Sequence, residues 1–454
     1  MSVREHKLKV GVSGVRGVVG EFLTPGLAAA LAQAFGTYTG AGRVIVGRDT
    51  RSSGLMFLHA VRTGLMAAGC EVVDTGILPT PTIQVYIAAT GARGGIAITA
   101  SHNPPEYNAL KFFNARGLFC NAYERAEIID LWHQSEFRHA LNSELRPLRH
   151  ELEAPKRLHF DRVLAHVDAD RIRHRRFRAA LDAVNGAGSL LSVEFLRDRL
   201  NCDLHAISVD PTQPFPRVAE PRPDTLGDLA ALVRANQCDI GFAQDPDGDR
   251  LAVCDETGRV LDNDDVLALA VDAALSRLPG DVAVNLTTSS AIDDIARRHN
   301  RRVFRTPVGE ANVVERMQAA KAVIGGEGSN GGIIFPAVQY CRDSYTGMAF
   351  LLDLMASTGL KISELARRIP QYHRRAGAVR YRHGRLAPLL QAVESAFPNS
   401  QHQDRTDGLK LIWAGRWIHV RGSNTEPVLR FTVESRSQQE ADQMFETVSA
   451  LARE

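Results

Sequence analysis

The chain has 454 residues, of which 44% are apolar and 23% charged, and its formal net charge is +2. At about 100–200 residues per domain, this length predicts several domains, and the near-neutral charge lacks the electrostatic footprint of a nucleic-acid-binding protein. The N-terminus has no apolar signal-peptide segment of about 7–15 residues, and no apolar run reaches the about 18 residues of a membrane span. The six cysteines are scattered without zinc-like spacing, so we expect reduced thiols in a cytoplasmic protein without membrane partners.

In the first third of the chain, apolar strand patterns alternate with helical patterns. Strands are expected at 43–47, 71–74 and 95–99, and a helix at 53–68. Strand, helix and strand at this spacing predict βαβ units and a sheet covered on both faces.

The same pattern begins twice more. The later strand patterns lie at 177–184, 239–243, 251–254, 281–286 and 323–325, and the helical patterns run to about residue 200 and over 291–298. The three units share a pattern and few identical residues, which predicts three α/β domains of similar build.

The last 80 or so residues have a different pattern. Two strands at 409–413 and 417–421 flank an Ala-Gly turn, a third strand follows at 429–434, and 438–450 forms an amphipathic helix. The expected fold class is therefore three similar mixed α/β domains plus a smaller C-terminal α+β domain. The expected domains are 1–150, 151–256, 257–370 and 371–454.

The acidic loop between two apolar strands contains Asp245, Asp247 and Asp249. At ~4 Å, each carboxylate pair costs about 1 kcal/mol in water and about 4 kcal/mol at an effective dielectric constant of 20, so a cation is expected among them. Oxygen ligands favour magnesium or calcium. An EF-hand loop is disfavoured because Arg250 stands where glycine is needed and strands flank the loop. A solvated acidic turn remains the alternative.

A second loop, at 99–104, directly follows an expected strand and contains Ser101 and His102. Ligands of open α/β sheets bind at the carboxyl ends of strands, so Ser101 is a candidate nucleophile. A serine needs a base or a metal to react, and Lys111 is the nearest candidate for a general acid or base. A turn-capping serine and a solvated lysine are the structural alternatives.

Two further loops have the composition of ligand sites. The glycine-rich segment 325–332 reads as an irregular loop whose Glu327, Ser329 and Asn330 suit sugar hydroxyls, with a flexible connection as the alternative. The other loop combines guanidinium, hydroxyl and amide groups that suit a phosphate. Its residues are Arg421, Ser423, Asn424, Thr425 and Arg430.

Weaker signals come from other basic segments. Arg16 lies in a loose Gly-x-x-Gly loop, and Arg48 and Arg51 lie in another Arg/Gly loop. The five arginines of 171–178 indicate a solvated face, with an anion-binding patch as the alternative. The chain contains no P-loop motif, which argues against a P-loop ATPase.

Taken together, these loops resemble the signature motifs of the α-D-phosphohexomutase superfamily, and the resemblance covers nearly the whole chain. The matching segments are TASHNP at 99–104, DPDGDR at 245–250, GE-x-S at 326–329, R-x-S-[NG]-T-E-P at 421–427, and G-[TS]-[DS]-G-[IV]-R-G at 11–17 with Val12 as a departure.

The resemblance implies an isomerase that moves a phosphoryl group between C1 and C6 of a hexose phosphate in one central cleft. It assigns the phosphoryl group to Ser101 and general acid/base catalysis to Lys111, and it implies that Arg16 and Arg250 lie near the reacting phosphate. His102, adjacent to Ser101, is a further catalytic candidate. It also implies one Mg²⁺ per chain, held by the three aspartates and Ser101, and a hexose bisphosphate as activator. The sugar loop and the phosphate loop would bind the substrate.

The preferred sugar is a separate question. Many members of the superfamily have His two residues after the sugar-loop serine, where this chain has Gly331. The run GGEGSNGGIIFP and the segment 306–310 resemble archaeal-type phosphoglucosamine mutases more closely, with phosphoglucomutase/phosphomannomutase as the alternative. A sugar phosphatase and a non-catalytic sugar-phosphate sensor are further alternatives, and the sequence leaves the oligomeric state open.

Overall fold

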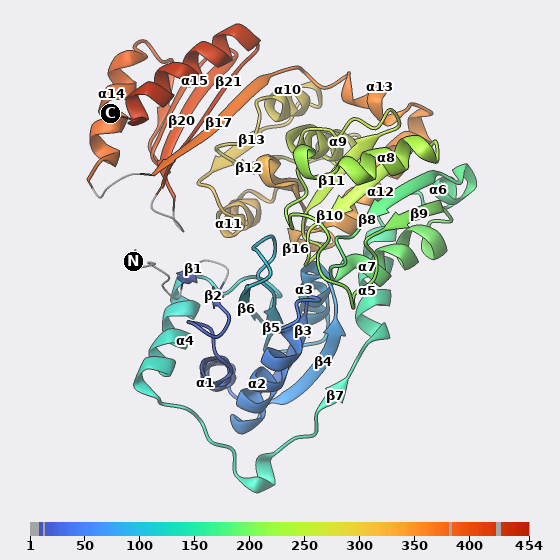
Figure 1. Ribbon diagram of the computed structural model, residues 1–454, viewed down its shortest axis with the longest axis vertical. Helices are drawn as coiled ribbons and strands as arrows, with labels where there is room; N and C mark the ends of the chain where they lie inside the picture. Colours follow the sequence, from blue (N-terminus) through green and yellow to red (C-terminus); the bar gives the residue numbers. More distant parts are fainter. Residues whose placement is uncertain (1–8, 12–13, 381–383, 424–427, 454) are drawn as a thin grey trace.

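The structure is a computed structural model that describes residues 9–11, 14–380, 384–423 and 428–453. Val12, Asn424 and Thr425, which the motifs single out, lie outside the described residues. The described chain forms four β-sheets, one in each of four domains (Figure 1). The expected fold class, three mixed α/β domains and a smaller C-terminal domain, is confirmed.

Domain 1 is built on a seven-stranded mixed sheet in the order β1-β2-β6-β5-β3-β4-β7. Strands β5, β3, β4 and β7 are parallel, as βαβ units require, whereas β6, β2 and β1 add antiparallel pairs that the sequence did not predict. The elements are β1 (Lys9–Gly11), β2 (Gly14–Val18), α1 (Pro25–Tyr38), β3 (Arg43–Arg48), α2 (Gly54–Ala67), β4 (Glu71–Ile77), α3 (Thr80–Ala89), β5 (Gly94–Ile98), β6 (Tyr107–Asn114), α4 (Ala122–Gln134) and β7 (Arg149–His150).

Both faces of this sheet are buried, as a short apolar strand run predicts. On β3, Val44 and Val46 belong to one core cluster, with residues of α1 and α2, while Ile45 belongs to another, with residues of α3. Successive side chains of a strand point to opposite faces, so one strand contributes to two separate cores.

Domain 2 has a four-stranded sheet in the order β11-β10-β8-β9, in which β8, β9 and β10 are parallel and β11 is antiparallel to β10. Part of the helix that the sequence predicts up to about residue 200 is a π-helix, Glu194–Arg199. The other elements are α5 (Glu153–Leu164), α6 (Ala169–Arg175), β8 (Arg178–Asp182), α7 (Gly188–Val193), β9 (Asp203–Ile207), α8 (Gly227–Ala235), β10 (Ile240–Gln244) and β11 (Leu251–Asp255).

Domain 3 has a five-stranded sheet in the order β13-β12-β14-β15-β16, parallel in its first three strands and antiparallel in the rest. Its elements are α9 (Asn263–Leu275), β12 (Val282–Asn285), α10 (Ala291–Arg298), β13 (Val303–Thr306), α11 (Glu310–Ala320), β14 (Ile324–Glu327), β15 (Gly332–Phe335), β16 (Gln339–Arg342), α12 (Ser344–Thr358) and α13 (Ile362–Ala366).

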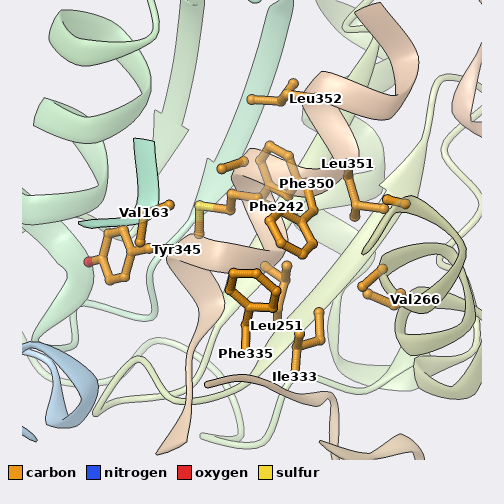
Figure 2. Close-up of a cluster of buried hydrophobic side chains, with 14 of the residues drawn as sticks. Val163, Phe242, Leu251, Val266, Ile333, Phe335, Tyr345, Phe350, Leu351 and Leu352 are labelled. Carbon is orange, nitrogen blue, oxygen red and sulfur yellow. The ribbon is translucent and has the colours of Figure 1, made fainter. Parts of the chain in front are cut away.

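One hydrophobic cluster joins domains 1, 2 and 3. Phe242 of β10, Phe335 of β15 and Phe350 of α12 pack within it, as Figure 2 shows. The rings of Phe335 and Phe350 lie 4.9 Å apart at 72°, an edge-to-face contact. Because the sheets of domains 2 and 3 share this core, the loops at their strand ends are held in a fixed relation.

Domain 4 has a five-stranded antiparallel sheet in the order β17-β21-β20-β19-β18, at the upper left of Figure 1. Its hydrophobic cluster contains only residues of this domain. Its elements are β17 (His373–Arg380), α14 (Leu386–Ala396), β18 (His402–Asp404), β19 (Leu409–Trp413), β20 (Arg416–Gly422), β21 (Val428–Ser435) and α15 (Gln438–Arg453). Among the described residues of all four domains, no helix has the length and apolar character needed to cross a membrane.

We expect Phe335→Ala to lower the free energy of unfolding by about 3–5 kcal/mol, because it leaves a cavity in the shared core. Phe335 is 1% exposed, whereas Tyr123, the control position, is 88% exposed. Urea unfolding of the two alanine variants measures the difference. A midpoint for Phe335→Ala no lower than that of Tyr123→Ala would contradict the shared-core interpretation.

Candidate active site

The loop between β10 and β11 brings three buried carboxylates together. Asp245, Asp247 and Asp249 each offer one oxygen, and these oxygens lie within 4.8 Å of one another. Gly248 has φ +67°, a left-handed conformation that lets the turn fold inward. Within the described part of the chain, Oδ1 of Asp247 and Oδ1 of Asp249 are buried and accept no hydrogen bond. Buried, unpaired carboxylate oxygens fit a hard divalent cation, so this triad could bind a metal.

The electrostatics of the loop reflect this crowding. Burial, reinforced by the charges of Asp249 and Asp247, raises the pKa of Asp245 well above its ordinary value. Burial also acts to raise the pKa of Asp247, but the charge of Lys111 and the hydrogen bonds from Lys111 and Thr80 outweigh it, so the pKa is lowered. A bound cation would favour the ionised form of all three carboxylates.

Lys111 reaches this loop from β6. Its Nζ donates to Oδ2 of Asp247 at 2.5 Å and lies 3.9 Å from Oδ2 of Asp249. Thr80 Oγ1 donates to the same Asp247 oxygen at 2.6 Å. Burial acts to lower the pKa of Lys111, but Asp247 and Asp249 outweigh it and raise the pKa, so the side chain is an ammonium group. A protonated lysine at this position can act as a general acid.

Ser101 lies at the carboxyl end of β5 and faces the acidic loop. Its Oγ donates to Oδ2 of Asp245 at 2.7 Å, and its backbone N–H donates to Thr99 Oγ1 at 3.0 Å. Its φ of +48° is in the left-handed region, which costs a non-glycine residue roughly 1–2 kcal/mol. The surrounding contacts hold this strained backbone and direct the hydroxyl toward the carboxylates.

Arg51 holds the serine loop in place, although sequence reasoning treated its segment only as a further Arg/Gly loop. Its guanidinium pairs with Asp49 at 3.0 Å, and Asp49 accepts a hydrogen bond from Thr99 Oγ1 at 2.6 Å. The guanidinium also donates to four backbone carbonyls of the loop, those of Ser101, Asn103, Pro104 and Tyr107. The only signal for this role in the sequence is an acidic residue between two arginines at the end of a strand.

His102 follows the serine, and its Nδ1 lies 3.4 Å from Ser101 Oγ. Burial lowers the pKa of His102 to about 2, with help from the charges of Arg250, Arg342 and Arg16. The imidazole is therefore neutral at physiological pH and adds no positive charge to the site.

Two predicted arginines line the cavity around Ser101. The Nη1 atom of Arg250 donates to Glu220 at 2.5 Å, and its Nε lies 4.0 Å from Asp245 Oδ2. Arg16 donates to the side-chain oxygen of Asn103. Both guanidinium groups are thus held beside the serine loop, where a phosphoryl group on Ser101 would meet them.

The sugar-loop residues lie at the end of β14 and directly after it. The expectation of one irregular loop over 325–332 is wrong at both ends, because β14 extends through Glu327, a short 3₁₀ turn, Gly328–Asn330, follows, and β15 begins at Gly332. Pairing of β14 with both β12 and β15 explains the longer strand. Glu327 Oε1 accepts hydrogen bonds at 2.9 Å from the side chain of Asn285 and from the backbone of Gly309.

Arg342, on β16, is a site residue that sequence reasoning missed. Its Nη2 donates to Asp249 Oδ2 at 2.7 Å and its Nε to Glu310 Oε2 at 2.9 Å, while Nη1 lies 3.8 Å from Glu327. It therefore connects the acidic loop of domain 2 to the sugar loop of domain 3. No motif surrounds it in the sequence, and its contacts are 32 and 93 residues away.

Most of the described predicted site residues line two neighbouring cavities, whereas the buried Asp245, Asp247 and Asp249 line neither. A small cavity of about 200 Å³ is lined by Arg16, Ser101, His102, Lys111, Arg250, Glu327 and Asn330. A larger cleft of about 1270 Å³ has walls from all four domains and includes Ser329, Asn330, Arg421, Ser423 and Arg430. The two share Arg16, His102, Arg250 and Asn330, so they form parts of one cleft. Asn424 and Thr425 lie outside the described residues.

The arginine-rich segment 171–178 lies outside both cavities. Arg171 pairs with the buried Asp353 of α12 at 2.6 Å, and Arg173 and Arg178 pair with Asp170 and Asp203. None of its described arginines lines either cavity. These pairs serve the packing of α6 and β8, and the segment is separate from the cleft.

A serine beside a carboxylate cluster, with a lysine and several arginines around the same cleft, defines an enzyme built for phosphoryl transfer. Residues 7–139, 157–258 and 262–372 match the alpha/beta/alpha domains I, II and III of phosphoglucomutase/phosphomannomutase, and residues 390–451 match its C-terminal domain. The chain belongs to this family. It is a phosphohexomutase, an isomerase that acts as an intramolecular phosphotransferase.

Whole-chain relatives agree with this assignment. The chain is 37% identical to a phosphoglucomutase/phosphomannomutase of Thermococcus kodakarensis, over 96% of both chains. It is 36% identical to a probable phosphoglucosamine mutase of Methanopyrus kandleri, over 96% of this chain and 95% of that one. A crystal structure of a putative phosphomannomutase from Thermus thermophilus superposes with a TM-score of 0.84 at 26% identity, over 98% of this chain and 99% of that one.

We expect binding of Mg²⁺ to the acidic loop to release protons, because the raised pKa of Asp245 favours its protonated form in the metal-free protein. Affinity should therefore fall as the pH is lowered. Calorimetric titration over a series of pH values, in buffers of different ionisation enthalpy, measures both effects, and Asp245→Asn should weaken binding and reduce proton release. Affinity that does not change with pH, with no proton release, would contradict this account of the loop.

Proposed function

We propose that the enzyme moves a phosphoryl group between C1 and C6 of a hexose phosphate through a phosphorylated Ser101, with glucosamine phosphate as the preferred substrate. The observation that carries this proposal is the position of Ser101 Oγ, 2.7 Å from Asp245 Oδ2, in the small cavity that adjoins a cleft with walls from all four domains. A cleft of this kind can hold a sugar with a phosphate at each end.

In the first transfer, the bond between Ser101 Oγ and phosphorus breaks, and a sugar hydroxyl oxygen forms a new bond to that phosphorus. The hydroxyl proton must leave, and the serine oxygen must be stabilised as the phosphoryl group departs. We assign both proton transfers to Lys111, which lines the same cavity as Ser101: its ammonium group donates a proton to the serine oxygen, and the resulting amine accepts the proton of the sugar hydroxyl. Arg16 and Arg250 stabilise the negative charge of the transferring group.

In the second transfer, the hexose bisphosphate has turned around and presents its other phosphate to Ser101. The bond between that phosphorus and its sugar oxygen breaks, the sugar oxygen takes up a proton from the Lys111 ammonium group, and phosphorus bonds to Ser101 Oγ, whose proton passes to the Lys111 amine. The phosphate that is not reacting needs a binding group in each orientation. Arg421, Ser423 and Arg430 line the far side of the cleft and suit this role, together with Asn424 and Thr425 of the same motif.

The proposed cofactor is one Mg²⁺ per chain, held by Asp245, Asp247 and Asp249 with Ser101. When bound, it supplies Lewis-acid stabilisation of the transferring phosphoryl group. The unpaired Oδ1 atoms of Asp247 and Asp249 support this assignment. A hexose bisphosphate is the proposed activator, because it can phosphorylate Ser101, and we propose a cytoplasmic location.

The proposed preference for glucosamine phosphate rests on the sugar loop. Its sequence, with Gly331 in place of the histidine of many members, resembles that of archaeal-type phosphoglucosamine mutases. The relatives carry both names: the Methanopyrus kandleri protein is named a probable phosphoglucosamine mutase and the Thermococcus kodakarensis protein a phosphoglucomutase/phosphomannomutase.

The proposal predicts that kcat/KM for glucosamine 1-phosphate exceeds the values for glucose 1-phosphate and mannose 1-phosphate, because kcat/KM measures discrimination between competing substrates. The assay contains Mg²⁺ and a trace of hexose bisphosphate. Higher values for glucose 1-phosphate and mannose 1-phosphate would contradict the proposed preference for glucosamine phosphate and leave the mutase assignment intact. No turnover of the three substrates would count against the proposed reaction itself.

Replacement of the proposed nucleophile gives a second prediction. Ser101→Ala should take up no radiolabel from a labelled hexose bisphosphate and should lose at least about 10³-fold in kcat, because the covalent route is removed. Ser357→Ala, an exposed serine of α12, is the control and should behave as wild type. Substantial turnover by Ser101→Ala would refute the phosphoserine route, and release of free phosphate as the main product would indicate a phosphatase.

A further inference from the structure

Asp407, in the turn between β18 and β19, joins the phosphate loop of domain 4 to domain 3. Its Oδ2 accepts a hydrogen bond from Arg421 Nε at 2.9 Å and another from the backbone N–H of Val308 at 2.9 Å. Its side chain is 15% exposed and that of Arg421 is 9% exposed, so water screens the pair only partly. One carboxylate oxygen therefore contacts both an expected phosphate-binding side chain and the neighbouring domain.

The turn itself is held firmly against β20. Gly408 has φ +82°, and a Cβ at this position would meet the carbonyl oxygen of Val420 at 2.2 Å. His419 Nε2 lies 2.6 Å from the carbonyl oxygen of Asp407. Burial lowers the pKa of His419 to about 4, so the ring is neutral and its Nε2–H donates to that carbonyl. The backbone of Asp407 is thus fixed relative to the strand that ends in the phosphate loop.

On the domain 3 side, Asp407 meets a segment that leads to the reacting centre. Directly after Val308, the N–H of Gly309 donates to Glu327 at 2.9 Å. The next residue, Glu310, pairs with Arg342 at 2.9 Å, and Arg342 pairs with Asp249 at 2.7 Å. Segment 307–310 therefore contacts the sugar loop directly, the phosphate loop through Asp407 and the acidic loop through Arg342.

Polar contacts orient domain 4, because its hydrophobic cluster does not merge with that of domain 3. Lys410 Nζ donates to the carbonyl of Leu286 at 2.5 Å, and Glu434 accepts from the backbone of Ser290 at 2.9 Å. Asp407 is the member of this set that also holds a cleft-lining arginine. Asp407 accepts its hydrogen bond from Nε of Arg421. The other two guanidinium nitrogens can still donate hydrogen bonds to an anion.

We propose that Asp407 is a positioning residue for phosphate binding: it directs Arg421 into the cleft and fastens the phosphate loop to segment 307–310. This inference rests on the phosphate-binding role proposed for Arg421. The ligand it serves is the phosphate group of the hexose phosphate that is not being transferred.

The kinetic test compares Asp407→Asn and Asp407→Ala with wild type on glucose 1-phosphate and glucosamine 1-phosphate. We expect KM to rise about tenfold or more, because a charge-assisted bond that orients Arg421 is lost, and kcat to change by less than about threefold. Asp404→Asn is the matched control. Asp404, the last residue of β18, is half-buried and accepts hydrogen bonds from the backbone N–H and the hydroxyl of Thr406 in the turn that also contains Asp407. Unchanged KM in both Asp407 variants would overturn the proposal.

A double-mutant cycle separates positioning from an independent role. If Asp407 acts through Arg421, then adding Asp407→Ala to Arg421→Ala should raise KM no further. Additive effects would show that Asp407 acts by another route and would overturn the proposal. Thermal melts identify any variant that fails to fold, and Asp407→Asn, which keeps the shape of the side chain, then replaces Asp407→Ala in the cycle.

Hydrogen exchange tests the link to domain 3 without any turnover. The Val308 amide should lose at least about tenfold in protection in Asp407→Ala and keep its protection in Asp404→Asn, because its acceptor is removed only in the first variant. Unchanged protection in Asp407→Ala would overturn the proposed link. If the wild-type enzyme turned over no hexose phosphate, the proposed function would fail while this measurement still reported on Asp407.

Discussion

The constraint on which the site depends is the crowding of Asp245, Asp247 and Asp249 in one buried turn. Lys111, Arg250 and Arg342 each approach these carboxylates. However, Arg250 also pairs with Glu220. Arg342 also lies close to the carboxylates of Glu310 and Glu327. The surrounding cations therefore fall short of neutralising the cluster. This deficit explains why a divalent cation fits the loop and why residues from three domains converge on it.

Burial of the turn follows from the packing of the sheets. The acidic loop, the serine loop and the sugar loop follow β10, β5 and β14, and all three strands lie inside their sheets. A single hydrophobic cluster fixes domains 1 to 3 against one another, so these loops meet at constant distances. Phosphoryl transfer requires mainly positioning and charge stabilisation, and a rigid three-domain core supplies both.

Domain 4 differs in how it is attached. Its sheet has its own core, and polar groups such as Asp407, Lys410 and Glu434 make its contacts with domain 3. An interface of this type is easier to open than a shared apolar core. In the proposed reaction, opening of domain 4 would let Arg421 release a phosphate and bind it again while the reacting centre keeps its geometry, as an intermediate that turns around in the cleft would require.

Local patterns were enough to predict much of this protein. Strand β3, helix α10 and the hairpin of β19 and β20 were found to within a residue or two, because apolar periodicity is a property of neighbouring residues. The aspartates that the structure brings together in the acidic loop were also singled out, because they are near neighbours in the sequence. Residue spacing could not reveal Arg51, Arg342 or Asp407, whose partners lie up to 56, 93 and 99 residues away. Only the tertiary structure decided those contacts, because a buried charge takes its role from whichever distant groups the fold places within hydrogen-bond reach.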